Sequence, residues 1–337
     1  MPPSAGRVTI RDVAAAAGVS RGTVSRVLNG EGYVSDRARE AIERAVRTVG
    51  YVPNTAARNL ALNRSGAVGL VVHEPHELFL EDPNIGAILL GANEVLSSAD
   101  QQLVSLVIDS ERDTERVVRY LRGGFVDGAV VVSAREHDAL LEALQRTTLP
   151  TALVGRPPHG VRMPWVGIDN AGAAAAVTGL LVDRGRRRVG IIAVGLDRDS
   201  GADRLAGFRS ALGAAFDPAL VVERPLYEYA AGRDAMRELL DRAPDVDGVF
   251  ATSDAVAAGA LEALLAAGRR VPDDVALVGF DDSSWARRCR PALTTVRQPA
   301  RDLGAAAAQL VLDQLAGMPA EPGGRLLPTQ VVARDSA

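Results

Sequence analysis

The chain of 337 residues contains no lysine and almost no cysteine, and all 38 of its basic residues are arginines. Its one cysteine, Cys289, can form no disulfide within the chain and argues against a cysteine-based metal site. No run of about 18 apolar residues occurs, so no transmembrane helix is predicted. The first residues lack the charged, apolar and small-residue pattern of a signal peptide, so we expect a cytoplasmic protein.

Two nucleotide-binding motifs that are common in enzymes are also missing. No G-x-G-x-x-G follows the first apolar run, and no G-x-x-x-x-G-K-[ST] occurs anywhere. None of the four histidines stands with a nucleophile in a pattern that indicates catalysis. His73 and His76 alternate with Glu74 and Glu77 in a way that a metal cluster would allow, but no further ligand is nearby in the sequence. We therefore expect no enzymatic activity, no bound metal and no cofactor.

The net charge of −4 is divided unevenly along the chain. Residues 1–64 contain ten arginines and five acidic residues, whereas the rest of the chain contains 28 arginines and 37 acidic residues. A small basic segment on a large acidic one suggests that the small segment alone binds a polyanion. The alternative is that the uneven distribution of charge arises by chance. The length of the chain independently predicts two or three domains.

The basic segment has a pattern of short helices, expected over residues 9–18, 20–30 and 35–50. Thr9 and Asp12 resemble a capping box at the first, Ser20 is suited to cap the second, and each helix ends at a glycine. Two short helices joined by a glycine-containing turn predict a helix-turn-helix unit, whose second helix enters the major groove of DNA. A helical hairpin with a solvated polar face is the alternative.

The polar face of the second helix carries the residue types that read DNA. Once Val24, Val27 and Leu28 point inward, arginines are left outside that can donate two hydrogen bonds to a guanine edge. Hydroxyl groups and the helix N-terminus suit phosphates. The residues that we expect to contact DNA from this segment are Thr9, Ser20, Arg21, Gly22, Thr23, Ser25, Arg26 and Asn29.

The larger segment alternates apolar runs with helical patterns, which predicts parallel β-sheets covered by helices on both faces. The runs form two consecutive series, so we expect two similar lobes with a cleft between them. The predicted strands lie within residues 67–74, 102–109, 127–134, 151–156, 165–170, 189–194, 248–254 and 275–282.

Ligands of such sheets bind beyond the carboxyl ends of the strands, so polar residues there are candidates for a binding site. Carboxylates, an arginine and small hydroxyls together with aromatic rings would suit a polyol. Helix caps and solvated loops are the alternative interpretation. The candidate effector-binding residues are Phe79, Asp169, Arg204, Tyr227, Ser253, Asp254, Asp281 and Trp285.

The stretch VTIRDVAAAAGVSRGTVSRVLNG at residues 8–30 resembles the lactose-repressor (LacI/GalR) family of bacterial transcription regulators. The resemblance implies that the variable pair Arg21 and Gly22, together with Arg26, selects base pairs. YVPNTAARNLA at residues 51–61 resembles the hinge of that family, a short helix that folds on DNA and lies in the minor groove. A plain linker is the alternative. The hinge residues implied to contact DNA are Asn54, Ala57 and Leu60.

The large segment resembles the effector domain of the same family, which shares the fold of type I periplasmic sugar-binding proteins. The matching stretches are DRLAGF (203–208), SDAVAAGA (253–260), VALVGFDD (275–282) and PALTTVRQP (291–299). By that resemblance Arg204 and Asp281 bind effector hydroxyls. Ser253 stands where the family usually has asparagine, and its shorter side chain loses one arm of a two-armed contact.

The resemblance implies a helix-turn-helix domain over residues 1–53 and a hinge helix with linker over 54–64. An effector-binding and dimerisation domain is expected over 65–337. Its first lobe is expected at about 65–168 and 300–327, and its second at about 169–299 and 328–337.

These features together predict a sequence-specific DNA-binding regulator, expected to repress carbohydrate-related genes. Its affinity for a palindromic operator would be switched by a small-molecule effector, expected to be a sugar. A regulator that needs a corepressor, or an activator, or a nucleobase effector, is the alternative. A secreted sugar-binding protein would share the fold of the large segment, but it would not need the basic N-terminal segment. No leucine heptad tail follows TQVVARDS, so we expect a homodimer and no tetramer.

Overall fold

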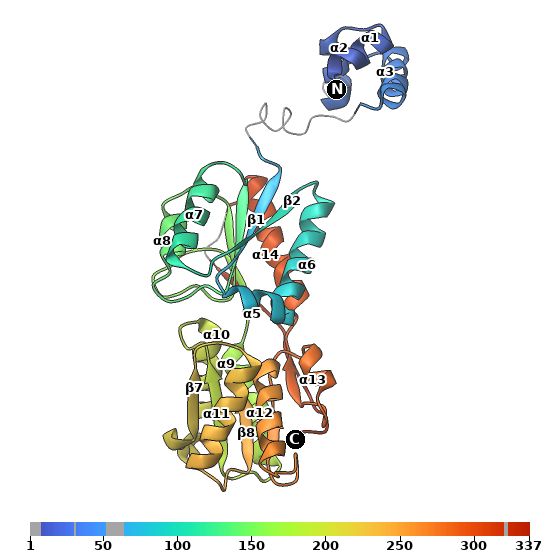
Figure 1. Cartoon of the computed structure of the whole chain (residues 1–337). Helices are drawn as coiled ribbons and strands as arrows, with labels where there is room; N and C mark the ends of the chain where they lie inside the picture. Colours follow the sequence, from blue (N-terminus) through green and yellow to red (C-terminus); the bar gives the residue numbers. More distant parts are fainter. Residues whose placement is uncertain (1–7, 30–31, 52–63, 320–322) are drawn as a thin grey trace, which may run out of the picture. The chain divides into compact units, whose positions relative to one another are not determined.

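The structure is a computed structural model that describes residues 8–29, 32–51, 64–319 and 323–337. It separates into two compact units, residues 1–65 and residues 66–337, called here the head and the body (Figure 1). The predicted division into a helical head and an α/β body is confirmed. None of the described helices is both long and apolar enough to cross a membrane.

The head consists of α1 (Ile10–Ala17), α2 (Arg21–Asn29) and α3 (Asp36–Val49). Gly18 ends α1 and Gly50 ends α3, both in the left-handed conformation that glycine adopts without a steric penalty. The three helices share one small core, which is why the apolar residues recur at helical spacing. The buried residues of this core are Val13, Ala14, Val24, Ile42 and Ala45.

The first lobe of the body is built on a six-stranded parallel sheet with the order β11-β5-β4-β3-β1-β2. Its strands are β1 (Ala67–Val72), β2 (Gln102–Val107), β3 (Gly128–Val132), β4 (Thr151–Val154), β5 (Trp165–Ile168) and β11 (Gly324–Leu327). The neighbouring interior strands β1 and β3 are buried along their whole length, as their unbroken apolar sequence requires.

Helices cover both faces of this sheet (Figure 1). One face packs against α6 (Pro83–Ser98) and α14 (Ala300–Leu315), and the other against α7 (Glu111–Arg122) and α8 (Ala139–Gln145). The short helix α5 (His76–Glu81) lies just before α6 in the chain.

The second lobe repeats this plan on a four-stranded parallel sheet with the order β7-β6-β8-β9. Its strands are β6 (Val189–Val194), β7 (Val221–Arg224), β8 (Gly248–Ala251) and β9 (Ala276–Val278). Its helices are α9 (Asn170–Asp183) and α10 (Asp199–Leu212) on one face, and α11 (Tyr229–Arg242) and α12 (Asp254–Ala266) on the other. Smaller elements are the 3₁₀ turns η1 (Gly213–Ala215) and η2 (Pro218–Leu220), α13 (Ser284–Arg288), and the antiparallel pair β10 (Thr295–Arg297) and β12 (Gln330–Val332).

The chain passes between the two lobes three times. The crossings lie between β5 and α9 (residues 168–170), between β10 and α14 (297–300), and between β11 and β12 (327–330). Three neighbouring connections restrict the lobes to a hinge-like movement about the crossings. Because the carboxyl ends of the strands face the cleft, residues that follow them line the space between the lobes.

Each of the eight predicted apolar runs contains a strand. The strands β7, β10, β11 and β12, which have three or four residues each, were not predicted from the sequence.

Candidate functional site

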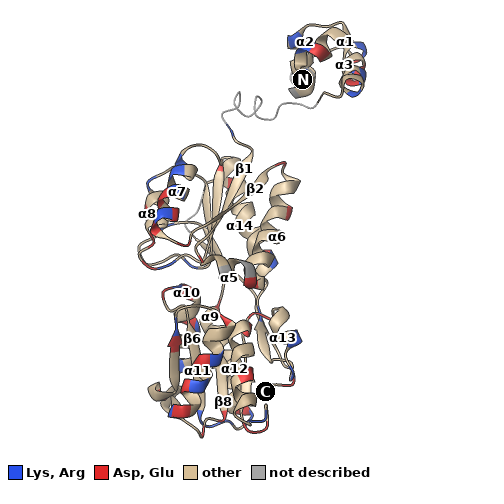
Figure 2. Cartoon of the chain, in the orientation of Figure 1, with Lys and Arg blue, Asp and Glu red and all other residues tan. Residues whose placement is uncertain are grey.

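Helix α2 keeps its polar residues outside the core of the head. Val24 is fully buried, whereas Arg21, Gly22 and Arg26 are exposed, and Figure 2 shows basic residues of this helix in blue. The Nε atom of Arg26 donates to the carbonyl oxygen of Gly22 at 3.3 Å, so this side chain lies along its own helix. One exposed hydrogen bond is easily exchanged, so Arg26 is free to turn toward another acceptor.

The hydroxyl residues of the head start its helices. Ser20 accepts the backbone N–H of Thr23 at 3.1 Å, and the two hydroxyl oxygens lie 2.9 Å apart. The carboxylate of Asp12 accepts the N–H of Thr9 at 2.7 Å and its hydroxyl at 2.8 Å, and these hydrogen bonds lower the pKa of Asp12. Both predicted caps are confirmed. Ser25 is half-buried on α2.

Four of the predicted DNA contacts cannot be placed. Asn54, Ala57 and Leu60, and the side chain of Asn29, lie outside the described residues.

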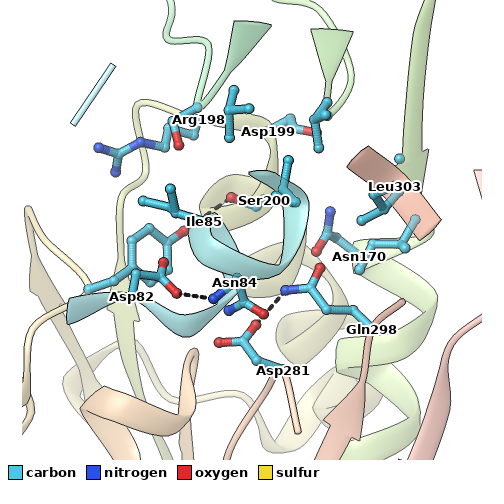
Figure 3. A pocket seen from close by; sticks show the side chains of 18 of the residues that line it. Asp82, Asn84, Ile85, Asn170, Arg198, Asp199, Ser200, Asp281, Gln298 and Leu303 are labelled. Carbon is cyan, nitrogen blue, oxygen red and sulfur yellow. Dashed lines mark hydrogen bonds between the residues drawn. The ribbon is translucent and has the colours of Figure 1, made fainter. Parts of the chain in front are cut away.

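A cavity of about 770 Å³, called here the main cavity, lies between the two lobes of the body (Figure 3). Apolar side chains of α6 and α14 form part of its wall, and polar side chains come from both lobes and from two of the crossings. The polar residues that line it include Glu74, Asp82, Asn84, Asn170, Arg198, Asp199, Ser200, Arg204, Tyr227, Asp281 and Gln298.

Arg204 of α10 has a buried side chain that several contacts hold in place. Its Nε donates to Oδ1 of Asn170 at 3.0 Å, and its Nη1 donates to the carbonyl oxygen of Thr252 at 2.6 Å. Its guanidinium carbon lies 3.6 Å from the ring centre of Phe280, and Nη1 lies 3.8 Å from Oδ1 of Asp281. A guanidinium fixed on three sides presents its remaining donors in one direction, which suits paired hydroxyls.

Asp281 faces Arg204 from the end of β9. Its φ of +114° is unusual for a residue with a side chain, and such strain is concentrated at functional sites. Gln298 donates from Nε2 to its Oδ1 at 2.7 Å, which ties the second crossing to the cavity. Burial raises the pKa of Asp281 well above its ordinary value, against the opposing effect of Arg204.

Tyr227 supplies an aromatic ring to the same cavity. Its hydroxyl lies 3.1 Å from the hydroxyl of Ser200, and burial raises its pKa. A ring held at one end by a hydrogen bond can pack flat against the apolar face of a ligand.

A smaller side cavity of about 360 Å³ adjoins the main cavity and shares Asp82, Tyr227 and Asp281 with it. Trp285 lines it, and its ring is stacked on Tyr229 with centres 5.6 Å apart.

Comparison with known proteins assigns both units of the chain. Residues 9–54 match the model of bacterial regulatory proteins of the lacI family, and residues 178–337 match the periplasmic binding protein-like domain. The HTH-type transcriptional regulator CelR of Thermobifida fusca is 43% identical over 98% of each chain. The chain belongs to the lacI family. It is a DNA-binding transcriptional regulator.

Two solved structures of the lacI family resemble the chain along almost its whole length. A transcriptional regulator CelR–cellobiose complex has a TM-score of 0.78 and 42% identity, and covers 98% of this chain and 100% of its own. The lac repressor dimer bound to operator and the anti-inducer ONPF has a TM-score of 0.87 and 25% identity, with 98% and 99% covered.

Of the effector residues predicted for this lacI-family chain, Arg204, Tyr227 and Asp281 line the main cavity, and Ser253 and Trp285 line the side cavity. The others are placed elsewhere. Asp169 caps α9 by accepting the N–H of Gly172 at 2.8 Å, and it does not line either cavity.

Asp254 and Phe79 do not line either cavity, and their predicted role in effector binding stays a prediction. Asp254 is fully buried and accepts hydrogen bonds from the Ser283 N–H at 2.7 Å and the Thr295 hydroxyl at 2.6 Å. Burial raises its pKa to about 7. Phe79 packs against the apolar core, because α5 turns its ring inward. Ser253 lines the side cavity and also caps α12 by accepting the Val256 N–H at 3.3 Å.

Several cavity residues were not predicted from the sequence. Asn170 directly follows the predicted Asp169, and the direction in which the chain leaves β5 decides which of the two faces the ligand space. Asn84 lies in the first turn of α6 and Gln298 in the second crossing, and the sequence does not show that these two segments meet at the cavity. Arg198 and Glu74 come from the two lobes and meet only in the folded body.

The histidines of the HEPHE stretch do not share a site. Nδ1 of His73 lies 3.0 Å from Asp138, and Nδ1 of His76 lies 2.8 Å from Asp109. Within the part of the chain that the structure describes, no three potential ligands stand close enough to hold a metal ion.

Proposed function

We propose that this regulator binds a sugar in the main cavity, and that the bound sugar changes its affinity for operator DNA. The observation that carries the proposal is the convergence of Arg204, Asp281 and Asn170 in a cavity that Tyr227 also lines. Charged and amide groups suit hydroxyls, and a flat ring suits the face of a pyranose. The cellobiose complex of the similar regulator CelR supports the choice of a sugar.

On the DNA side, we propose that Arg21 and Arg26 read base edges in the major groove, while Thr9, Ser20, Thr23 and Ser25 lie toward the phosphates. We assign the same general role to Gly22 and Asn29, and to Asn54, Ala57 and Leu60 of the hinge. Two copies would be needed for two half-sites, and the similar lac repressor was solved as a dimer on its operator.

We further propose that residues 1–53, 54–64 and 65–337 act as DNA-binding domain, hinge and effector domain. The sugar is proposed to lower operator affinity by favouring a closed arrangement of the lobes. Coupling free energies of this kind are typically about 1–3 kcal/mol. We propose no catalytic role for the chain, and we propose that it acts in the cytoplasm, where a bacterial DNA-binding regulator meets its operator.

Fluorescence anisotropy tests the proposal. Palindromic duplexes selected from a random-sequence library are titrated with the full chain at several salt concentrations, and cellobiose, glucose, ribose and adenine are then added. We expect sequence-preferring, salt-sensitive binding that one of the sugars weakens. Binding that no sugar changes would refute the effector role, and strengthening by a sugar would refute the proposed sign.

The substitution Asp281→Ala should abolish the response to the sugar and leave operator binding unchanged, because Asp281 faces the main cavity in the body. The matched control is Asp245→Ala, which removes an exposed carboxylate of the same lobe and should leave the response intact. An Asp281→Ala protein that responds to the sugar at wild-type concentrations would remove Asp281 from the binding site.

A further inference from the structure

Two sets of polar contacts join the lobes directly across the cleft, and they differ in burial. The inner set is the ion pair of Glu74, which follows β1, with Arg198, which precedes α10; Nη2 and Oε2 are 2.7 Å apart. The outer set joins Arg156, after β4, to Asp203 of α10 through two contacts of 2.7 Å. Side chains of the inner pair are 3% exposed, whereas those of the outer pair are 51% and 29% exposed.

This difference in burial decides which pair controls the cleft. Exposed ion pairs are screened by water and contribute little, so the pair of Arg156 and Asp203 is a weak clamp. Removing one partner of a buried pair leaves a buried charge without its counter-charge. Substitution of Glu74 or Arg198 should therefore destabilise the closed arrangement more than substitution of Arg156 or Asp203.

Further contacts extend the inner pair into a small network. Arg135 of the first lobe donates to Glu74 at 3.1 Å and lies 3.4 Å from Asp197 of the second lobe. The backbone N–H of Glu136 donates to the carbonyl oxygen of Asp197 at 2.9 Å. The network stands between the main cavity and an outer cavity of about 880 Å³, and Arg198 lines both.

The closed network also carries a cost. The Nε and Nη1 atoms of Arg198 are buried and have no hydrogen-bond partner among the described residues. Nη1 lies 3.5 Å from Oδ1 of Asp197, which is too long for a good hydrogen bond. A Cβ atom at Gly195 would lie 2.6 Å from Nη1, so only glycine fits beside this group. Burial also raises the pKa of Glu74. Opening the cleft would hydrate these groups, so water favours the open state as the ion pair favours the closed one.

We propose that the Glu74–Arg198 pair is a latch that keeps part of the effector-free protein in the closed arrangement of the lobes, which a bound effector would then populate further. The attraction within the pair is offset by the unsatisfied donors of Arg198, so the closed and open states are close in free energy. A small difference in free energy allows a small ligand to shift the equilibrium between them. The latch is a property of the effector-free body. Its use in regulation rests on the proposed function.

Lobe separation in the full chain tests the latch. Donor and acceptor dyes are placed on Glu115→Cys in α7 and Asp241→Cys in α11, both exposed, in a Cys289→Ser background, with excess unlabelled protein. Single-molecule energy transfer without sugar should show a closed population. Arg198→Met should lower the closed-to-open ratio at least tenfold, and the control Arg156→Met, which removes the exposed pair, should change it less than threefold.

The variant Glu74→Gln tests the latch independently if Arg198→Met does not fold, because glutamine keeps the shape of the side chain and removes its charge. It should also shift the population toward the open state, and urea unfolding confirms that each variant is folded. Equal ratios in wild type, Arg198→Met and Glu74→Gln would overturn the latch, as would an equal loss in Arg156→Met.

Addition of cellobiose separates this inference from the proposed function. If the ligand-free ratios shift as expected and neither cellobiose nor glucose alters the lobes or operator binding in the wild type, the latch stands and the sugar effector fails. If sugars act on the wild type and the ligand-free ratios do not depend on Arg198, the latch fails and the sugar effector stands.

Discussion

Arg21 is the exposed arginine closest to the start of α2, and its neighbour Gly22 has no side chain with which to contact a base. Arg21→Ala should therefore weaken binding to the selected operator by roughly 1–3 kcal/mol and relax the base preference at one pair of each half-site. Anisotropy titrations against operators with each base substituted measure both effects.

The control for this substitution is Arg47→Ala, which removes an equal charge from the exposed face of α3. It should weaken binding to all duplexes slightly and equally, and reduce the dependence on salt. If Arg21→Ala also weakens every sequence to the same extent, Arg21 contacts a phosphate and does not select a base.

Asp254 makes stability depend on pH. Its carboxyl titrates near 3.8 when exposed and at about 7 in the folded body, where burial disfavours its charge. Between these pH values the folded protein holds a proton that the unfolded chain has lost, so the free energy of unfolding falls as pH rises. The whole loss is on the order of 4 kcal/mol, of which about 3 kcal/mol falls between pH 5 and pH 8, and Asp254→Asn should be free of it. Urea unfolding at pH 5, 6, 7 and 8 measures the difference.

Asparagine fits this site because its oxygen can accept the Ser283 N–H while its amide donates to the Thr295 hydroxyl. Asp274→Asn is the control, because Arg270 lowers the pKa of Asp274 to about 2 and the group stays ionised throughout the same pH range. A constant difference between wild type and Asp254→Asn across the range would show that Asp254 is ionised in the folded protein.

At the residue scale, the sequence located the ends of eight of the strands but could not distinguish a residue that lines the cavity from one that caps a helix or turns into the protein. Arg204 and Asp281 both line the main cavity, whereas Asp254, which also follows a strand, turns into the protein. Asp254 turns inward because the Thr295 hydroxyl donates a hydrogen bond to its carboxylate. Thr295 lies on β10, far from Asp254 in the sequence, so the sequence alone does not show this contact.

Helices of the body approach one another through glycine. A Cβ atom at Gly91 of α6 would lie 1.9 Å from the carbonyl oxygen of Arg301 in α14, closer than atoms can approach. Gly91→Ala should therefore force the two helices apart and destabilise the body by about 1–3 kcal/mol. Chemical unfolding of the full chain measures this loss.

The control lies in the same helix. Gly86 has no atom within 4 Å of the position of a Cβ, so alanine there should stabilise the helix by about 0.5–1 kcal/mol. Opposite signs for the two substitutions are expected. A similar loss at both positions would mean that the effect comes from the backbone of α6 and not from its packing on α14.

Elements were predicted well where their sequence is long and apolar, and poorly at the edges. β1 and β3 are buried on both faces, so their apolar runs are unbroken. β11 has an exposed arginine and leucine on the sheet edge, and it lacks the pattern that marks a buried strand. The short strands β10 and β12 form only because the chain returns to the second lobe beside them, which is a long-range effect.

On the scale of the whole molecule, the basic head is the DNA-binding part and the acidic body holds the proposed effector site. α2 has nine residues, so one head can contact only a few base pairs. Two heads on adjacent half-sites multiply this limited specificity, which favours a homodimer on a palindrome. Sedimentation equilibrium should give twice the chain mass of 35.3 kDa, and titration should give two chains per operator duplex.

A duplex with a single half-site is the control, and it should bind at least tenfold more weakly, because the second head then contacts DNA without reading bases. Equal affinity for half-site and palindrome, with one chain per duplex, would show that a single head is sufficient. A mass of four chains would instead mean that a second interface joins two dimers, and the operator would then need two palindromes within reach of one molecule.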